Sequence, residues 1–239
     1  MLRKIWTIGF ISIFVLCTAA LAQRDRLLDT QEGTIPADGV SQLRMDVAAG
    51  SLQVIGDPEA SQVRYRAEFR GEDEAMLDRM QFDHRVNGGT IDIRTRTDSR
   101  GWGNSGRIDL TLWAPSSLVV DIKDGSGSMK VGGFDRDVFI DDGSGSIDVE
   151  DIGGNLEIED GSGSIQVSGL GGSARIRDGS GSVSLRDVGG SVAIRDGSGG
   201  ISVRDVEGDF EVESDGSGGI DYSRIAGRVR VPEKKRRKW

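Results

Sequence analysis

The residues best suited to chemistry are aspartates that recur at a fixed spacing. Each opens a Gly-Ser-Gly turn; the first five are 18 residues apart and the last step is 19: Asp124, Asp142, Asp160, Asp178, Asp196 and Asp215. Carboxylates are good ligands for the hard cation Ca²⁺. An aspartate before Gly-Ser-Gly can instead accept hydrogen bonds from backbone N–H groups of its own turn. We favour self-capping turns, and we expect that folding does not require calcium.

The calcium alternative comes from a resemblance of the half-repeat. The nine-residue Gly/Asp unit is similar to the calcium-binding β-roll of repeats-in-toxin proteins, Gly-Gly-x-Gly-x-Asp-x-apolar-x. The β-roll places its calcium aspartate two positions after the second glycine of the turn. Apolar residues occupy that position here: Ile147, Ile165, Val183, Ile201 and Ile220. The usual ligand set is therefore missing, and we expect no metal and no cofactor.

No catalytic constellation can be assembled from the sequence. His84 is the single histidine, and Cys17 is the single cysteine. A β-solenoid polysaccharide enzyme would need clustered carboxylates on one face, whereas the acids here are spread over turns and ladders. We expect a protein that is not an enzyme and has no catalytic residues.

Two other features could contact a partner. Trp102 lies among glycines in a short polar loop, 99–106, and could contact a glycan or a protein partner, or fold back over the core. The tail, 232–239, carries five adjacent cations and Trp239, which could touch an anionic membrane surface weakly. We favour a solvated end that blocks further stacking of coils.

The repeat dictates the elements that position these residues. Each 18-residue unit has two halves, and each half reads as a turn of small residues followed by a short alternating strand. In the first half of the second unit, Ile147 and Val149 share one face while Asp148 and Glu150 share the other. One half cannot bury its apolar face alone, but stacked coils can. Parallel crossovers are right-handed. The sequence predicts an all-β, right-handed parallel β-solenoid with 18-residue coils and two short strands per coil.

The same phase predicts what fills each corner and face of the solenoid. Apolar side chains fill one corner: Phe134, Ile152, Leu170, Val188, Val206 and Ile225. Serine hydroxyls fill the opposite corner: Ser126, Ser144, Ser162, Ser180, Ser198 and Ser217. One core row runs through both sheets' interior up to Tyr222, and another up to Val229. An outer row of charged residues is expected at Glu159, Arg177, Arg195, Glu213 and Arg230.

The rest of the chain divides by composition. Residues 1–22 have a basic start, an apolar run and Ala20-Leu21-Ala22, which predicts a secretory signal peptide cleaved after Ala22; an uncleaved anchor is the alternative. Cleavage would change the formal net charge from −9 to −11, because Arg3 and Lys4 are lost. This charge argues against nucleic-acid binding. Residues 23–40 are expected to be an extended leading segment, 41–123 irregular N-terminal coils with one short helix near 72–81, and 124–231 the regular solenoid.

Roughly residues 40–231 resemble a bacterial exported family labelled "putative adhesin", a domain of unknown function with β-strand repeats. The resemblance rests on the stretch 49–54 (AGSLQV), the strand 90–94 (TIDIR), the turn 112–115 (LWAP) and the tandem Asp-Gly-Ser-Gly-Ser units. It implies a β-solenoid in the cell envelope and brings no catalytic residues. We expect a periplasmic, surface or secreted binding module for an envelope protein or glycan; a module that senses envelope stress or regulates the response to it is the alternative.

Overall fold

The computed structural model describes residues 25–97 and 106–232, and in this part nearly every element is a strand. The strands of the N-terminal part are β1 (Arg26–Pro36), β2 (Gln42–Ala49), β3 (Leu52–Asp57), β4 (Gln62–Gly71), β5 (Met80–Asn87), β6 (Thr90–Thr97) and β7 (Arg107–Pro115). The strands of the repeats are β8 (Val119–Phe134), β9 (Val138–Asp142), β10 (Gly145–Ile152), β11 (Leu156–Asp160), β12 (Gly163–Leu170), β13 (Ala174–Asp178), β14 (Gly181–Val188), β15 (Val192–Asp196), β16 (Gly199–Val206), β17 (Phe210–Asp215), β18 (Ile220–Ile225) and β19 (Val229–Arg230).

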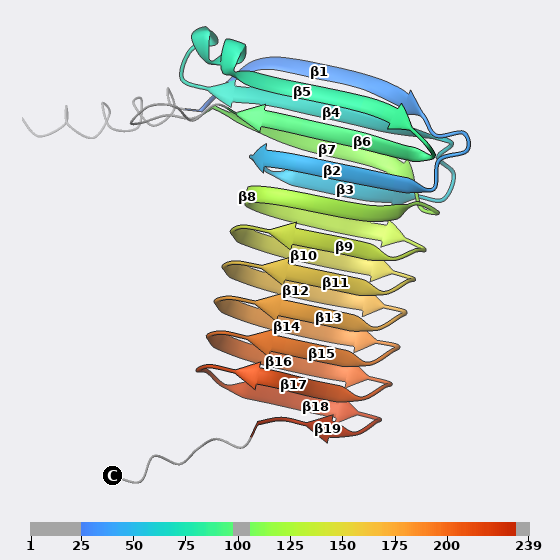
Figure 1. The fold of residues 1–239 in the computed structure, drawn as a ribbon, viewed down its shortest axis with the longest axis vertical. Coiled ribbons are helices and arrows are strands. Elements are labelled where there is room, and N and C mark those ends of the chain that lie inside the picture. Colours follow the sequence, from blue (N-terminus) through green and yellow to red (C-terminus); the bar gives the residue numbers. More distant parts are fainter. Residues whose placement is uncertain (1–24, 98–105, 233–239) are drawn as a thin grey trace, which may run out of the picture.

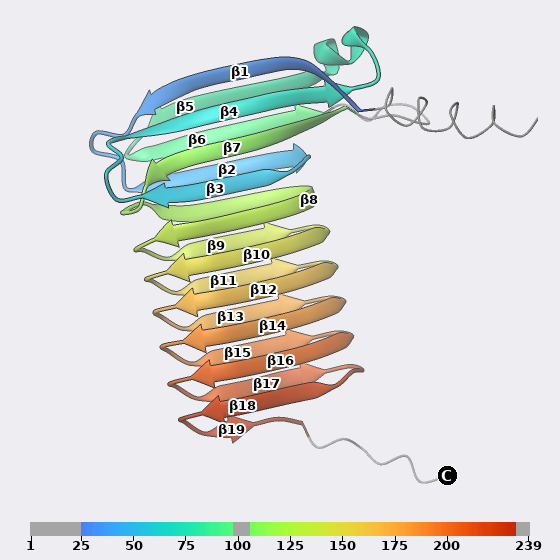
Figure 2. The same cartoon turned by 180° about the vertical axis from the view of Figure 1, so that it is seen from behind.

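From β8 onward the chain winds as a right-handed solenoid with two facing sheets (Figures 1 and 2). Sheet A contains β10, β12, β14, β16 and β18, and sheet B contains β9, β11, β13, β15, β17 and β19. Neighbouring strands within each sheet are parallel, and each residue lies beside its equivalent 18 positions later, as Ile158 does beside Ile176. The predicted fold and coil length are confirmed.

The 19-residue step is accommodated as a β-bulge in sheet B. Ile194 lies opposite Val212, but the next pair joins Arg195 to Ser214, so Glu213 is the additional residue. A bulge lets one strand carry an extra residue without shifting the rest of the ladder. The core phase is therefore kept on both sides of the insertion.

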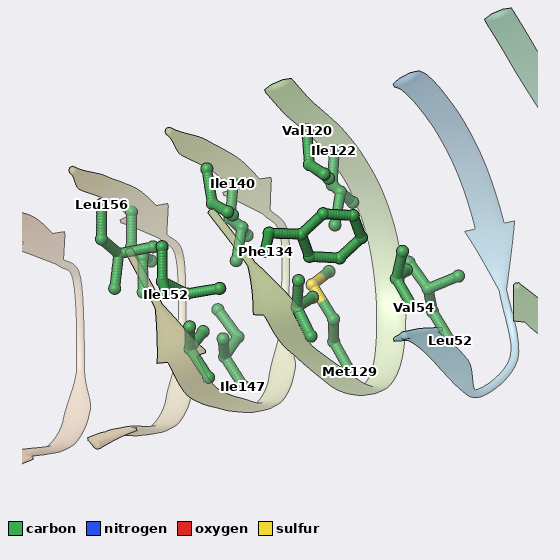
Figure 3. Close-up of a cluster of buried hydrophobic side chains, with 14 of the residues drawn as sticks. Leu52, Val54, Val120, Ile122, Met129, Phe134, Ile140, Ile147, Ile152 and Leu156 are labelled. Atoms are coloured by element: carbon green, nitrogen blue, oxygen red, sulfur yellow. The ribbon is translucent and has the colours of Figure 1, made fainter. Parts of the chain in front are cut away.

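The core is a stack of aliphatic layers between the two sheets, shown for the first coils in Figure 3. Phe134 fills the apolar corner there, and its equivalents Ile152, Leu170, Val188 and Val206 are also buried. The last coil departs from the prediction, because nothing stacks on its far side among the described residues. Tyr222 is 46% exposed and Val229 is 36% exposed, although both were expected in the core.

The corner opposite Phe134 is filled by aspartate and not by serine. Asp142 and its equivalents are buried, whereas Ser144 and most of its equivalents are only half-buried. The backbone turns so that the aspartate that ends each sheet B strand points inward. The expectation of a hydroxyl-filled corner was wrong, because a charged residue was assumed to face solvent.

The N-terminal part closes the solenoid with antiparallel strands. Strands β2 and β3 continue the parallel sheets, but β4 pairs antiparallel with β7 and with β1, and β5 pairs antiparallel with β6. The segment expected to be an extended leader thus contributes a paired strand, β1. Tyr65, Phe82 and His84 stack between the sheets at this end, with ring centroids 4.7 to 6.1 Å apart.

The expected helix is shorter than predicted and of another type. It is the 3₁₀ helix η1 (Glu74–Arg79), and Met80 and Gln81 already belong to β5. Met80 is buried, so strand pairing and core packing end the helix there. Within residues 25–97 and 106–232, no helix has the length and apolar character needed to span a bilayer.

Candidate functional site: a groove on sheet B

A hollow of about 470 Å³ lies on the outer face of sheet B, across β9 to β17. Its floor follows one outward row of the ladder, in which Phe139, Glu157, Arg175, Ala193 and Glu211 lie side by side on successive strands. Ala193 is the smallest member of this row. The short side chain leaves space between its larger neighbours, and that space is the groove.

One side of the groove is a ladder of short polar side chains at the turn before each sheet B strand. The backbone N–H of Asn155 donates to Asp137 Oδ1 (2.7 Å), and that of Ser173 donates to Asn155 Oδ1 (3.0 Å). The N–H groups of Ser191 and Asp209 donate in the same way to Ser173 Oγ and Ser191 Oγ, each at 3.0 Å. Each coil thus satisfies a backbone donor of the next coil, which holds this wall in one geometry.

The charges around the groove are mostly paired. Glu157 lies 3.3 Å from Arg177 and Glu211 lies 4.0 Å from Arg230. Arg175 has no ion pair within 4.0 Å among the described residues, because the neighbouring strand carries Ala193 at the facing position. At the other end of the floor, Phe139 is 40% exposed. The groove therefore offers an aromatic face and an unpaired guanidinium.

Two of the predicted outer pairs are present and one is replaced. Arg177 pairs with Glu159, and Arg195 pairs with Glu213. Arg230 was expected to pair with Glu213, but it lies beside Glu211 in the ladder. The expectation was wrong by one ladder position, because the bulge at Glu213 was not included in the register.

The other residues singled out in the sequence do not meet at this groove. Trp102, the cleavage position after Ala22 and the tail beyond Pro232 lie outside the described residues. His84 belongs to the aromatic cluster with Tyr65 and Phe82. Among the residues that the structure describes, no three or more His, Cys, Asp or Glu side chains are grouped as metal ligands.

The aspartate turns have the self-capping geometry. Oδ1 of Asp142 accepts a hydrogen bond from the backbone N–H of Ser144 (3.2 Å), and the same bond joins Asp160 to Ser162 (3.1 Å). Asp178 and Asp196 cap Ser180 and Ser198 in the same way, each at 3.0 Å. The turn itself therefore supplies a donor to one oxygen of each of these carboxylates.

The groove was missed in the sequence, although its signal is there. Ala193 stands where the other units carry a large or charged residue, and the 18-residue register places it between Arg175 and Glu211. Reading the outward positions for size as well as for charge would have located the hollow. Phe139 was likewise visible as an apolar residue at an outward position.

Several solved structures cover most of the chain at low identity. A "putative cell adhesion protein" from Clostridium sporogenes is 8% identical, with a TM-score of 0.37 over 84% of this chain and 97% of its own. A "putative adhesin" from Bacteroides fragilis is 12% identical, with a TM-score of 0.46 over 84% and 96%. A "putative lipid binding protein" from Parabacteroides distasonis is 16% identical, with a TM-score of 0.35 over 86% and 96%.

No curated protein matches the sequence. A family model does match, and it covers residues 56–226, which is more than half of the chain. The repeats, the facing sheets and the N-terminal strands β4 to β7 all fall within this match. The chain belongs to the Toastrack DUF4097 family.

Proposed function

We propose that this protein is a non-enzymatic binding module of the bacterial cell envelope, and that it binds an extended glycan strand in the groove on sheet B. The observation that carries the proposal is the exposed ring of Phe139 at one end of a hollow whose floor also holds the unpaired Arg175. A large exposed apolar side chain beside polar groups that converge on a hollow is typical of a ligand site. Aromatic rings offer sugars a flat apolar face, and a guanidinium donates several hydrogen bonds in a fixed plane.

The shape of the groove supports an elongated ligand. It extends over β9, β11, β13, β15 and β17, which are parallel neighbours about 4.8 Å apart. The hydroxyls and amides along its wall already bond to the backbone, so they are held in place and lose little freedom when a ligand binds. A rigid, repetitive floor suits a repetitive polymer.

Export is part of the proposal. The Ala20-Leu21-Ala22 site predicts cleavage after Ala22, and the family resemblance supports the envelope, the periplasm or secretion. N-terminal sequencing of the protein from a cell fraction is the test. A chain that still begins at Met1 and stays in the inner membrane would contradict the signal-peptide assignment.

The binding test uses a glycan array followed by calorimetry on the mature protein. Phe139→Ala should weaken binding of any glycan hit at least tenfold, and Ala193→Arg should do the same by filling the hollow. Lys130→Ala, on the outer face of sheet A, is the matched control and should leave affinity unchanged. Trp102→Ala tests the loop that the sequence analysis singled out.

The outcomes separate the alternatives. A glycan whose affinity falls with Trp102→Ala and not with either groove variant would move the site to the loop. A folded protein that binds no glycan on the array would contradict a glycan ligand, and a protein partner would then be the next candidate.

A further inference from the structure

The buried aspartates form a continuous column inside the solenoid, separate from the groove. Consecutive members are ladder partners on neighbouring strands, so the column runs through the repeats at one residue per coil. Their exposed fractions are only 3 to 6% for Asp124, Asp142, Asp160, Asp178 and Asp196. Buried carboxylates are rare unless something compensates them.

Each carboxyl in the column has one oxygen without a partner. In the four central members Oδ1 accepts the backbone N–H described above, and the other oxygen, Oδ2, is buried and makes no hydrogen bond. Asp124 Oδ2 and Asp215 Oδ1 are also buried without a partner. A buried acceptor without a donor is costly, and the cost is greater when it carries charge.

No cation offsets these charges. The charged groups that act on the column are the neighbouring aspartates themselves, together with Asp141 beside Asp142. The sheet A strand that follows each turn begins with Gly and Ser or Gly, as β12 does, and contributes no charge there. At the N-terminal end of the column, Val47 is the ladder partner of Asp124. The described residues also provide no group of three or more metal ligands.

Burial is the largest cause that raises the pKa of these carboxyls, and neighbouring carboxylates add to it at several positions. The pKa of Asp124 is raised to about 7, and those of Asp142 and Asp178 to about 6. The pKa values of Asp160 and Asp196 are raised as well, in both cases first by burial. The capping N–H groups act in the opposite direction and do not cancel the shift.

We propose that the aspartate column is a proton-binding site of the folded protein. A proton taken from solvent onto an unpartnered oxygen turns that oxygen from an acceptor into an O–H donor, which can then bond to a carboxylate oxygen of the neighbouring aspartate. No other bond forms or breaks. Each proton removes one repulsion between neighbours and supplies the missing donor.

The direction of the pH effect follows from linkage. Between the unfolded pKa near 4 and the folded values of about 6 to 7, the folded chain binds more protons than the unfolded chain. The free energy of unfolding therefore decreases as pH rises through this window. The stabilisation from the column is complete below pH 4 and is lost by pH 8.

The test combines carboxyl titration with stability measurements on the mature protein. Carboxyl ¹³C NMR should show a group of aspartates that titrate between pH 5.5 and 7.5, at least ~1.5 units above the usual value. The denaturant midpoint should fall from pH 5 to pH 8. Asp160→Asn keeps the capping oxygen and removes the charge, so it should raise the melting temperature at pH 8 by several degrees and leave it nearly unchanged at pH 4.

Two controls keep the inference falsifiable even if one variant fails to fold. Asp148→Asn neutralises a half-exposed aspartate on sheet A and should not change the slope of stability against pH. Calcium at millimolar concentration should not raise the melting temperature at pH 8. Titration of all aspartates below pH 4.5 would overturn the proposal, and a calcium-dependent rise in melting temperature would replace the proton with a bound cation.

Discussion

Gly163 lies so close to Gly145 that a Cβ atom on Gly163 would fall 1.5 Å from the carbonyl oxygen of Gly145. The two glycines are ladder partners at the aspartate corner, and Gly163 has a φ of +148°. Only glycine combines this backbone conformation with such a close approach. The second glycine of each Asp-Gly-Ser-Gly turn is thus fixed by the coil beside it and not only by its own turn.

The first prediction concerns this contact. Gly163→Ala should destabilise the protein by at least about 2 kcal/mol, because both the strained backbone and the carbonyl contact would have to be relieved. Gly200→Ala is the matched control, since a Cβ there meets nothing within 4 Å. It should change the free energy of unfolding by less than about 0.5 kcal/mol. Denaturant unfolding of both variants is the measurement, and equal losses would contradict the stacked-glycine geometry.

The second prediction concerns the two faces of a strand. Ile176→Asp should unfold the repeats or cost more than about 4 kcal/mol, because Ile176 is fully buried and a charge there would have no partner. Arg177→Ala should cost less than about 1 kcal/mol, since its ion pairs with Glu157 and Glu159 are exposed. Thermal melts compare these adjacent positions directly. Similar melting temperatures for the two variants would mean that the inward and outward faces are reversed.

A third prediction concerns acid pH and the N-terminal part. Burial alone would raise the pKa of Asp109, but hydrogen bonds from the Ser51 N–H and from Arg107 outweigh it and hold the pKa below the usual value. Asp109 therefore contributes stability that is present above the unfolded pKa near 4 and is lost as pH falls through the folded value. Asp109→Asn should destabilise the protein by about 1 to 3 kcal/mol at pH 7 and by much less at pH 2.5.

The control for this third prediction is Asp83→Asn, an exposed carboxylate in β5, which should have little effect at either pH. Stability should be highest near pH 4 to 5, because the aspartate column and Asp109 act in opposite directions with pH. An Asp109→Asn variant whose loss of stability is the same at both pH values would show that the side chain acts through packing and not through its charge.

The fourth prediction is that folding does not require calcium. The capping N–H groups of Ser144, Ser162 and Ser180 occupy one oxygen of their aspartates, and apolar residues fill the β-roll ligand position. Circular dichroism of the mature protein should show the same strand signal with excess chelator and with millimolar calcium. Loss of the signal in chelator and its return with calcium would favour the β-roll alternative.

The parts of the fold that could be predicted are those governed by a repeated pattern. The alternation of Ile147 and Val149 with Asp148 and Glu150 fixes which face is buried, and a constant 18-residue period fixes which residues are neighbours. The antiparallel pairing of β1 with β4 could not be predicted in this way, because neither strand belongs to a repeat. Its register depends on tertiary contacts at the end of the solenoid.

The aspartate corner shows a second limit of sequence reasoning. A charged residue next to glycines reads as solvent-exposed, and only the backbone path at the turn brings Asp142 inside. The groove shows a third limit, because its shape depends on the relative sizes of Phe139, Ala193 and Glu211, which are 18 to 72 residues apart in sequence. Both features follow from the register once it is known.

The uniform register between β9 and β16 makes the protein modular at the genetic level. An in-frame duplication or deletion of 54 nucleotides would add or remove one whole 18-residue unit and leave the remaining neighbours facing equivalent surfaces. The molecule would become longer or shorter by about 4.8 Å, the spacing of adjacent strands. Its reach from the membrane or wall could therefore be adjusted in discrete steps while both end structures stay the same.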